Sequence, residues 1–520
     1  DGLLTLGNGA IVKRDASMAS VNEIPSFGTT NDFWYITGAG ATGDELPTST
    51  TVINDLRIEV NTTLSDDATV NGTLFLVGGT FDLTAGTADV TMAAGATINR
   101  SGGTMDLAPL VTSYNVIWSN AVDIIAGPEL VGASVANLDV QPTGGADVDL
   151  SANVTMSGDL TLNPAVATSE LDFAGFSLTT AGEVTVTSGI LTNSGATLSQ
   201  FTFNGAAAQT FTVPGAGLQL PATGTTSAME LVLNNTSMEG VTLAGGNLTM
   251  ANLPQVAAGP PVVYANTSIM RFINGTLTTG DNVVTLWQAA SGTNQPLQGY
   301  DRTGVLTNKY SHIIGNVKKF VDRTNTVAIT EVTFPVGTAP TSPGYYRPAS
   351  IFFTTAPQSS VNLTVSHDNN SPRGTNGIPL TSGSKTITNY PDFFWYVKSD
   401  QNLPPSYQYD TEFQAQGYTD YLEDGIQDVR LIRRDSGNVA NEWVLQGDDA
   451  NYDNSTINAE WPVVKVINAT GGITTQGSRF TYSQLNKAPY FTAEMPDQTV
   501  DEGDLVEFTY AAADPDVGKT

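Results

Sequence analysis

A short apolar β-unit that appears three times constrains the fold of this chain more than any other feature. Each copy opens with an alternating apolar triplet and closes with a glycine that is followed by a second alternating strand. The copies occupy residues 56–76, 138–162 and 231–250. Spacings of 86 and 88 residues separate the closing glycines, which are Gly72, Gly158 and Gly246. A period-two pattern that returns at near-constant spacing is typical of a repeat array, so we predict stacked β-structure.

The local pattern predicts an all-β protein. The chain has 520 residues with 51 Gly and 26 Pro, and its Val-Thr and Leu-Thr alternations are broken by glycine and Asx turns. Alternation places Leu, Val and Met on one face and Thr, Asp or Asn on the other, as in strands with one buried side. Short strands and glycine-rich turns favour a right-handed parallel β-helix, or β-solenoid. A large β-sandwich array shares the same local pattern and remains the alternative.

Changes in composition divide the chain into three predicted domains. Residues 1–320 form the β-solenoid with an N-terminal cap. Aromatic and charged residues become more frequent and strands lengthen after that point, so we predict an immunoglobulin-like antiparallel sandwich over residues 321–486. Residues 487–520 begin a third β-module.

Composition also excludes several classes of function. The chain has no cysteine, which removes catalytic thiols, disulfides and thiolate metal sites. With 21 Lys and Arg against 51 Asp and Glu, the net charge is −30, which repels nucleic acid phosphates and anionic membranes. No apolar stretch approaches the roughly 20 residues of a membrane helix. Cations remain plausible partners.

The C-terminal residues resemble the first two strands of cadherin-like and related Ig-like repeats of bacterial surface proteins. The resemblance rests on residues 489–491 and 495–500, an Glu502-Gly503 turn and the Ala513-Asp514-Pro515-Asp516 segment. Such repeats are extracellular tandem modules, and many bind calcium. Because the β-module breaks off at Thr520, we expect the gene product to continue beyond it. The chain starts at Asp1 with no basic-apolar leader, so any signal peptide has already been removed.

A second resemblance covers more of the chain. Several sequence motifs of this chain are similar to those of large bacterial surface proteins exported by type IX secretion, which join a Gly/Thr-rich solenoid to a sandwich. The segments that carry it are residues 315–320, 333–338, 346–348, 394–396, 430–433 and 443–444. The resemblance implies an extracellular location on a bacterial cell surface and implies no reaction. No sorting domain of that class is visible in the sequence.

Calcium is the one cofactor that the sequence suggests. Asp449, Asn451, Asp453 and Glu460 stand at positions 1, 3, 5 and 12 of a calcium-loop spacing, and hard cations prefer such oxygen ligands. Asn454 replaces the usual glycine, and strands flank the segment, so an ordinary Asx-rich turn is the competing interpretation. The cadherin resemblance implies a second set of calcium ligands, namely Asp501, Glu502, Asp514 and Asp516.

Three consecutive aromatic residues, Phe33, Trp34 and Tyr35, have two interpretations. Aromatic faces bind sugar rings, so the three residues are candidates for a glycan-binding platform. The alternative is a capping strand whose rings cover the open end of the first coil.

Catalysis has weaker support in the sequence. Glycosidic cleavage needs grouped carboxylates, and the solenoid offers only dispersed ones: Asp66, Asp67, Asp89, Asp106, Asp147, Asp149, Asp159 and Asp172. Between Asp15 and Ile269 the only basic residues are Arg57 and Arg100. The two histidines, His312 and His367, are isolated in sequence, and a structural role is predicted for His312 in its alternating strand.

These observations predict an extracellular structural protein that forms or decorates a filament, sheath or surface layer by association with copies of itself. The rival hypotheses are a surface adhesin that binds glycans and a β-helix polysaccharide lyase or hydrolase. We expect no enzymatic activity, no nucleic acid partner and no membrane span.

Overall fold

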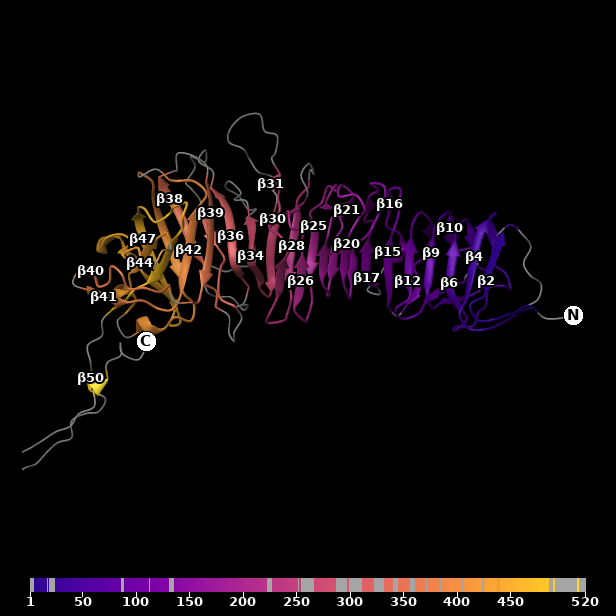
Figure 1. Ribbon diagram of the computed structural model, residues 1–520, viewed down its shortest axis with the longest axis horizontal. Coiled ribbons are helices and arrows are strands. Elements are labelled where there is room, and N and C mark those ends of the chain that lie inside the picture. The colour runs from indigo at the N-terminus through magenta and orange to yellow at the C-terminus, as the bar shows by residue number, and fades with distance from the viewer. Residues whose placement is uncertain are drawn as a thin grey trace, which may run out of the picture. The chain divides into compact units, whose positions relative to one another are not determined.

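Parallel pairing of short strands organises the first part of the chain in the computed structural model. β2 (Ile11–Asp15) pairs with β4 (Asn31–Thr37), and this first series of pairings continues strand by strand to β36 (Ile313–Val321). Figure 1 shows β2, β4, β6, β9 and β12 side by side in chain order. The structure describes residues 4–15, 17, 24–85, 88–111, 113–130, 135–221, 227–250, 252–253, 266–286, 297–298, 311–321, 332–339, 345–355, 361–370, 372–383, 385–403, 406–422, 425–436, 438, 440–485, 490–491 and 512–513.

The first series contains thirteen parallel strands in chain order. Between β4 and β36 they are β6 (Ile53–Ile58), β9 (Thr73–Leu76), β12 (Thr97–Arg100), β15 (Tyr114–Trp118), β17 (Val135–Val140), β20 (Leu160–Leu162), β23 (Val184–Val186), β26 (Gln209–Thr212), β29 (Val241–Ala244) and β34 (Leu277–Leu286).

Further parallel sheets are formed by the strands that lie between members of the first series. One group is β5 (Gly40–Ala41), β7 (Thr62–Thr63), β10 (Thr80–Asp82) and β13 (Thr104–Met105), and another is β16 (Ile124–Ile125), β18 (Val148–Asp149), β21 (Glu170–Asp172) and β24 (Ile190–Thr192). Three shorter groups are β1 (Thr5–Leu6) with β3 (Ser26–Phe27), β8 (Ala68–Val70) with β11 (Val90–Met92) and β14 (Leu110–Val111), and β27 (Leu218–Leu220) with β30 (Leu248–Met250) and β34.

A last parallel group continues along the same part of the chain. It contains β19 (Val154–Met156), β22 (Leu178–Thr180), β25 (Ser199–Phe203), β28 (Met229–Asn234), β33 (Ile269–Asn274) and β35 (Leu297–Gln298). The other elements here are the antiparallel pair β31 (Asn252–Leu253) and β32 (Asn266–Thr267), β37 (Val332–Phe334) and the 3₁₀ turn η1 (Pro128–Leu130).

Strict alternation produces the core of this stack. In the first series Leu56 pairs with Leu74 and Leu74 with Ile98, and all three side chains are fully buried. The intervening residues, such as Phe75 and Asn99, point outward and are half-buried. In-register stacking therefore turns a period-two sequence into continuous apolar ladders, each of which is covered by the next strand along the stack.

The three sequence copies are not equivalent in the structure. In the first two, the opening triplet pairs directly with the closing strand, because Leu56 lies beside Leu74 and Leu138 beside Leu160. In the third, the triplet lies in β28, which pairs with β25 and β33, whereas the closing strand β30 pairs with β27 and β34. The predicted repeat therefore holds for two copies and fails for the third.

Antiparallel sheets replace parallel ones in the rest of the chain. One sheet contains β39 (Val361–Asp368), β42 (Phe394–Ser399), β48 (Ser478–Tyr482), β44 (Leu431–Asp435) and β45 (Val444–Leu445). A second contains β38 (Ala349–Thr355), β43 (Gln408–Gln414), β47 (Trp461–Ala469) and β46 (Ser455–Asn458). The remaining elements are β40 (Leu380–Ser382), β41 (Lys385–Asn389), β49 (Gln484–Leu485) and the 3₁₀ turns η2 (Asp420–Leu422), η3 (Ile426–Asp428) and η4 (Asp449–Asn451).

Aromatic rings fill the space between these two antiparallel sheets. Trp395 of β42 lies 4.8 Å from Phe413 of β43, measured between ring centroids, and Phe413 lies 5.4 Å from Phe480 of β48. All three rings are buried. The phenolic hydroxyl of Tyr482 donates a hydrogen bond to the Phe413 carbonyl at 2.6 Å. Large rings let the two sheets pack closely, and the polar atoms of Trp395 and Tyr482 find backbone acceptors.

The chain divides into two compact units, Asp1–Tyr346 and Arg347–Thr520. We predicted the first boundary at 320, whereas the first compact unit extends to Tyr346. Just after β37, Val336 forms a parallel bridge with Ile313 of β36, and the Pro335 carbonyl accepts the Ile313 amide hydrogen. Of residues 487–520, the structure describes only β50 (Tyr490–Phe491) and β51 (Ala512–Ala513), which pair in antiparallel fashion. The prediction of an all-β protein is confirmed, with large and mostly parallel sheets.

Candidate functional site

The aromatic triplet of β4 does not form one platform. Alternation along the strand directs Phe33 and Tyr35 into the core, where each is 1% exposed, and leaves only Trp34 on the outer surface. Two rings buried against the stack cannot contact a glycan from solution. β4 itself is paired on both sides, by β2 and by β6, so Phe33 and Tyr35 are core residues within the strand series.

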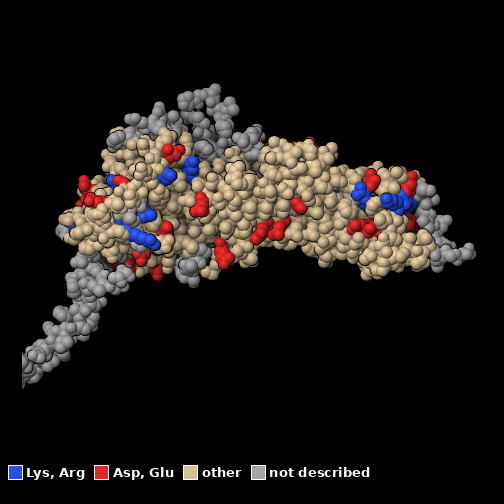
Figure 2. Space-filling model, viewed as in Figure 1, with Lys and Arg blue, Asp and Glu red and all other residues tan. Residues whose placement is uncertain are grey.

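Trp34 belongs to an outward row of cationic and aromatic side chains. Lys13, Trp34, Arg57 and Phe75 are in register on four neighbouring strands. The Lys13 Nζ lies 4.4 Å from the centre of the Trp34 ring, and the Arg57 Cζ lies 5.6 Å from it. The two cations come from the strands on either side of β4. Figure 2 shows Lys, Arg, Asp and Glu atoms close together at this end of the first unit, where Figure 1 has β2, β4 and β6.

This row predicts a modest stabilising role for Trp34. Replacing Trp34 with leucine is expected to lower the free energy of unfolding by about 1 kcal/mol, since it removes two half-exposed cation–π contacts. Urea titration measures the change. Phe75→Leu is the matched control, because Phe75 contacts Arg57 alone among the cations (5.9 Å), and a smaller loss is expected there. Equal losses for the two variants would show that Lys13 contributes nothing.

Most of the candidate catalytic aspartates of the first unit hold turns together. The Asp67 carboxylate accepts a hydrogen bond from the Asp89 amide at 2.9 Å, 22 residues further along the chain. The same contact between successive turns is made by four others: Asp106 with Leu83 (2.8 Å), Asp147 with Glu170 (2.8 Å), Asp159 with Glu183 (2.7 Å) and Asp172 with Ser194 (2.9 Å). A carboxylate that accepts a backbone N–H satisfies a donor that a turn would otherwise leave unpaired. Their spacing in the sequence therefore reflects the stacking of turns.

Asp149 has a different environment, with other carboxylates close by. It pairs in register with Asp172 on the next strand, and Asp147 and Asp123 lie nearby. Burial raises the pKa of Asp149, and the charges of Asp172, Asp147 and Asp123 raise it further. The structure thus brings acidic groups together at β18 and β21 and pairs none of the four with a basic residue.

This crowding predicts that Asp149→Asn stabilises the chain at neutral pH. The folded-state pKa of Asp149 is raised, so the charged form destabilises the fold once the pH exceeds the unfolded-state pKa, and the penalty is complete above the folded-state pKa. A gain of about 0.5 kcal/mol is expected at pH 7 and none at pH 3. Urea titrations at the two pH values measure it. Asp159→Asn, which keeps an oxygen for the Glu183 amide, is the control with no expected gain, and a gain there of equal size would remove the electrostatic explanation.

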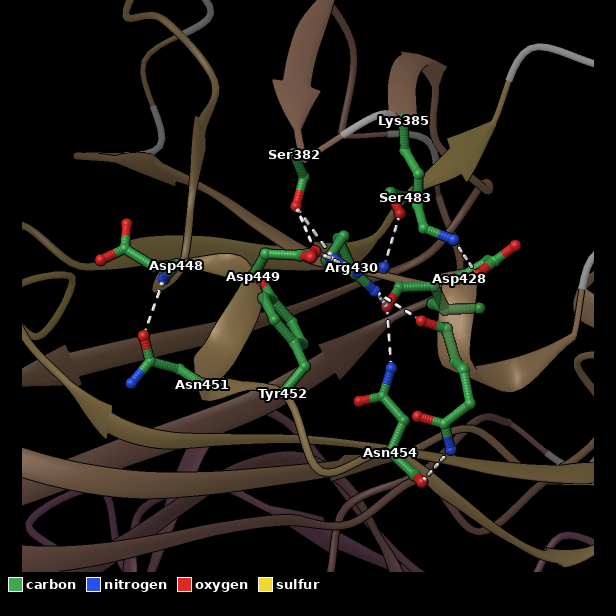
Figure 3. A network of polar contacts seen from close by, with 12 residues as sticks. Ser382, Lys385, Asp428, Arg430, Asp448, Asp449, Asn451, Tyr452, Asn454 and Ser483 are labelled. Carbon is green, nitrogen blue, oxygen red and sulfur yellow. Dashed lines mark hydrogen bonds and ion pairs between the residues drawn. The ribbon is translucent and has the colours of Figure 1, made fainter.

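The predicted calcium loop is assembled differently from a metal site. The Arg430 guanidinium forms an ion pair with Asp449, and the Ser382 hydroxyl donates to the same carboxylate at 3.0 Å. The Asn451 side chain accepts the Asp448 amide hydrogen at 3.1 Å and so caps η4. In Figure 3 the Asp449 carboxylate points toward Arg430 and Ser382, whereas the Asn451 side chain points toward Asp448.

The other two predicted ligands are also separated from this point. Asp453 pairs with Lys465 of β47 at 3.1 Å, and Glu460 lies in the turn before that strand. Within the residues that the structure describes, no three His, Asp or Glu side chains are grouped so that they hold a metal ion. The Asx-rich turn is therefore the interpretation that the geometry favours. Asp501, Glu502, Asp514 and Asp516 lie outside the described residues.

Arg430 is the centre of the network in Figure 3. It is 3% exposed, its guanidinium lies 4.7 Å from the Tyr452 ring, and its amide donates to the Ser483 hydroxyl at 2.7 Å. Asn454 donates to the Val429 carbonyl at 2.8 Å beside it. These contacts join β40, β44, η4 and the end of β48 around one buried cation. The arrangement positions a loop and leaves no reactive group unpaired at its centre.

Acid is expected to weaken the Arg430–Asp449 contact. Hydrogen bonds from Arg430 and Ser382 lower the pKa of Asp449 below its usual value of 3.8. A lowered pKa means that the stabilisation is present above the unfolded-state pKa and is lost as the pH falls through the folded-state pKa. Asp449→Asn should therefore lower the melting temperature at pH 7, and the difference should disappear below the folded-state pKa.

Thermal unfolding followed at pH 7 and at pH 2 tests this expectation. Asp453→Asn is the matched control, because its partner Lys465 is a third exposed and such surface pairs contribute little. A loss for Asp449→Asn that persists unchanged at pH 2 would contradict the ionic explanation.

Both histidines have structural environments. His312 is fully buried, its Nε2 donates to the Thr338 carbonyl at 2.7 Å, and burial lowers its pKa to about 4. The ring of His367 stacks on Phe393 at 5.9 Å and meets Trp395 edge-on at 5.4 Å. The structural role predicted for His312 fits this packing.

Sequence reasoning missed two buried ion pairs inside the stack, Arg14 with Glu45 and Arg100 with Glu129. Arg100 occupies an inward position of the alternation, between Leu76 and Trp118 on the neighbouring strands. An arginine in a row of inward apolar residues, in a stretch that is nearly free of basic residues, was the available signal. Comparisons of the chain with protein-family models, curated proteins and solved structures found no match.

Proposed function

We propose that this chain is an extracellular structural protein that forms or decorates a bacterial cell-surface assembly by associating with copies of itself. The single observation that supports the proposal most is the unbroken first series of parallel strands from β2 to β36. We infer that the first unit is a right-handed parallel β-helix and that the second is an immunoglobulin-like sandwich.

Stacked strands suit a mechanical function. Each rung of a parallel ladder is hydrogen-bonded to the next, so bending the stack strains many backbone bonds at once. Asx side chains add further bonds between successive turns, as Asp67 does with Asp89 and Asn137 with Asp159. A stiff element of this kind can project from a cell surface and hold the domains at its two ends apart. The carboxylates that a polysaccharide lyase or hydrolase requires are largely engaged in these turn contacts.

The proposed location rests on composition and on the resemblance to proteins exported by type IX secretion. Of the segments that carry that resemblance, those after Tyr346 lie in the second unit. There the Arg347 guanidinium lies 4.3 Å from the Phe393 ring, and the Trp395 indole donates to the Arg347 carbonyl at 2.8 Å. Within the described residues, no helix is both long enough and apolar enough to cross a bilayer.

Electron microscopy of the purified chain, with calcium and with a chelator, tests the proposal. Regular fibres or sheets at micromolar concentration would support self-association, and a sample with chelator that assembles equally well would show that calcium is dispensable. Monomers at every concentration, measured in parallel by sedimentation, would overturn it. We expect the same preparation not to depolymerise acidic or neutral polysaccharides. Measurable cleavage would support the polysaccharide lyase or hydrolase hypothesis instead.

A glycan-binding adhesin is the second candidate, and the half-exposed Trp34 and Phe75, which lie in one outward row on either side of Arg57, favour it. Aromatic residues flanked by Arg57 and Lys13 offer a surface on which sugars find both apolar and hydrogen-bonding contacts. A glycan array with the full chain and with Trp34→Ala tests it. Binding that Trp34→Ala abolishes would support the adhesin, whereas silence of both proteins would remove it.

A further inference from the structure

The second buried ion pair lies at a point where the stack lacks a strand. Arg100 is 4% exposed and Glu129 is fully buried, and Nη1 of the arginine lies 2.5 Å from Oε1 of the glutamate. The same Nη1 donates to the Ile125 carbonyl at 2.8 Å. The Glu129 Oε1 also accepts the Gly127 amide hydrogen at 3.0 Å and the Trp118 indole hydrogen at 3.3 Å. One oxygen of the Glu129 carboxylate thus connects Arg100 of β12, Trp118 of β15 and the turn η1.

The first buried ion pair repeats this arrangement contact by contact. Nη1 of Arg14 pairs with Oε1 of Glu45 and donates to the Ala41 carbonyl at 3.0 Å. The Glu45 Oε1 accepts the Gly43 amide hydrogen at 2.9 Å and the Tyr35 hydroxyl hydrogen at 3.0 Å. Tyr35 takes the position of Trp118, since it is the register partner of Arg14 as Trp118 is of Arg100.

The two pairs also share a sequence signature. Residues 9–14 read GAIVKR and residues 95–100 read GATINR, while residues 43–46 read GDEL and residues 127–130 read GPEL. The next equivalent strand is β23, where Val186 follows Leu162 in register as Arg100 follows Leu76. An arginine therefore occupies this inward position in β2 and β12, and an apolar residue, Val186, occupies it in β23.

The segments that carry the glutamates have no strand of their own. The structure shows no strand between β5 and β6, and η1 is the only regular element among described residues 126–130. Backbone ladders hold the rest of the stack, so side-chain contacts take their place here. Tyr114 adds one such contact, because its hydroxyl donates to the Glu129 carbonyl at 2.7 Å.

We propose that each buried pair is a latch that holds its Gly-x-Glu-Leu segment against the interior of the stack, and that the segment opens when the latch is broken while the parallel ladders stay intact. The contacts that fix the segment converge on one carboxylate, whereas the neighbouring strands keep their own hydrogen bonds. A break at the carboxylate therefore frees the segment first. This inference does not depend on the proposed function.

Hydrogen exchange measured by mass spectrometry on the full chain tests the latch. Glu129→Gln removes the charge and leaves the side-chain volume nearly unchanged. Exchange of the amides in residues 127–130 is expected to accelerate on the order of tenfold or more, because hydrogen bonds to a charged group are the stronger kind. Exchange in β15, β16 and β17 should stay as in the wild type. Glu45→Gln should accelerate exchange in residues 43–46 in the same way and leave β5 unchanged.

Glu59→Gln is the matched control, because Glu59 pairs with Arg57 at 2.6 Å on the outside of the same stack and both side chains are about a third exposed. It should leave exchange unchanged. Uniform acceleration across the whole stack in Glu129→Gln, or no acceleration in either latch variant, would overturn the proposal. Because the two latches are separate, a failure of Glu129→Gln to fold leaves Glu45→Gln as an independent test.

Discussion

Replacing Arg100 with methionine is expected to lower the free energy of unfolding by about 3–5 kcal/mol, because the change leaves Glu129 buried and without its cation. Glu129 is fully buried, so water cannot take the place of the guanidinium. Methionine keeps most of the volume of the arginine stem, which limits any contribution from a cavity. Urea titration followed by circular dichroism measures the loss.

The double variant separates charge from packing. Arg100→Met combined with Glu129→Leu removes both charges, so the pair should cost clearly less than the sum of the two single changes. Val186 at the equivalent strand position already shows that an apolar residue fits this row. Arg57→Met is the matched control at the outward pair and should stay within about 1 kcal/mol of the wild type. Strict additivity in the double variant would show that the two charges do not interact.

Replacing Trp395 with alanine is expected to cost the second unit about 3–5 kcal/mol. Trp395 is fully buried, its ring centroid lies 4.8 Å from Phe413 and 5.4 Å from Tyr482, and its indole donates to the Arg347 carbonyl at 2.8 Å. Alanine removes the ring contacts and leaves that carbonyl without the donor. Hydrogen exchange in β42 and β48 over a urea series reports the loss within this unit.

Two further variants locate the origin of that loss. Trp395→Phe keeps a ring and removes the indole donor, so a smaller loss of about 1–2 kcal/mol is expected. Trp34→Ala, at the half-exposed tryptophan of β4, should have no effect on exchange in β42 or β48. A Trp395→Ala variant whose second unit unfolds at the wild-type urea concentration would contradict the central place given to this ring.

The sequence by itself determined the strands and which face of each is buried. Alternation at Leu56-Arg57-Ile58 placed Leu56 and Ile58 inside and Arg57 outside, as the structure has them. The same alternation runs along β39, where Val361, Leu363 and Val365 are buried. Alternation is a local property, because successive side chains of any strand point to opposite sides. No knowledge of the partner strand is needed to read it.

Only the tertiary structure decided which strands become neighbours. Register partners on consecutive strands of the first series are 24 residues apart at Leu160 and Val184, but 36 residues apart at Val241 and Leu277. The number of residues between register partners therefore increases along the chain, so two segments at a fixed sequence separation no longer fall on the same sheet. For this reason the third copy of the repeat is not equivalent to the first two. Turn lengths set this change, and period-two patterns carry no information about them.

The same reason explains why the sequence did not predict the partners of the candidate site residues. Asp449, Asn451 and Asp453 are close in sequence, yet each has a different partner. Ser382 of β40 and Arg430 bind Asp449, Lys465 of β47 pairs with Asp453, and Asn451 accepts the Asp448 amide hydrogen. Arg100 and Glu129 are far apart in sequence and meet only because the stack returns one beside the other. Local patterns predict what a side chain prefers as a partner. The identity of that partner depends on long-range packing, which the coil lengths of this stack control.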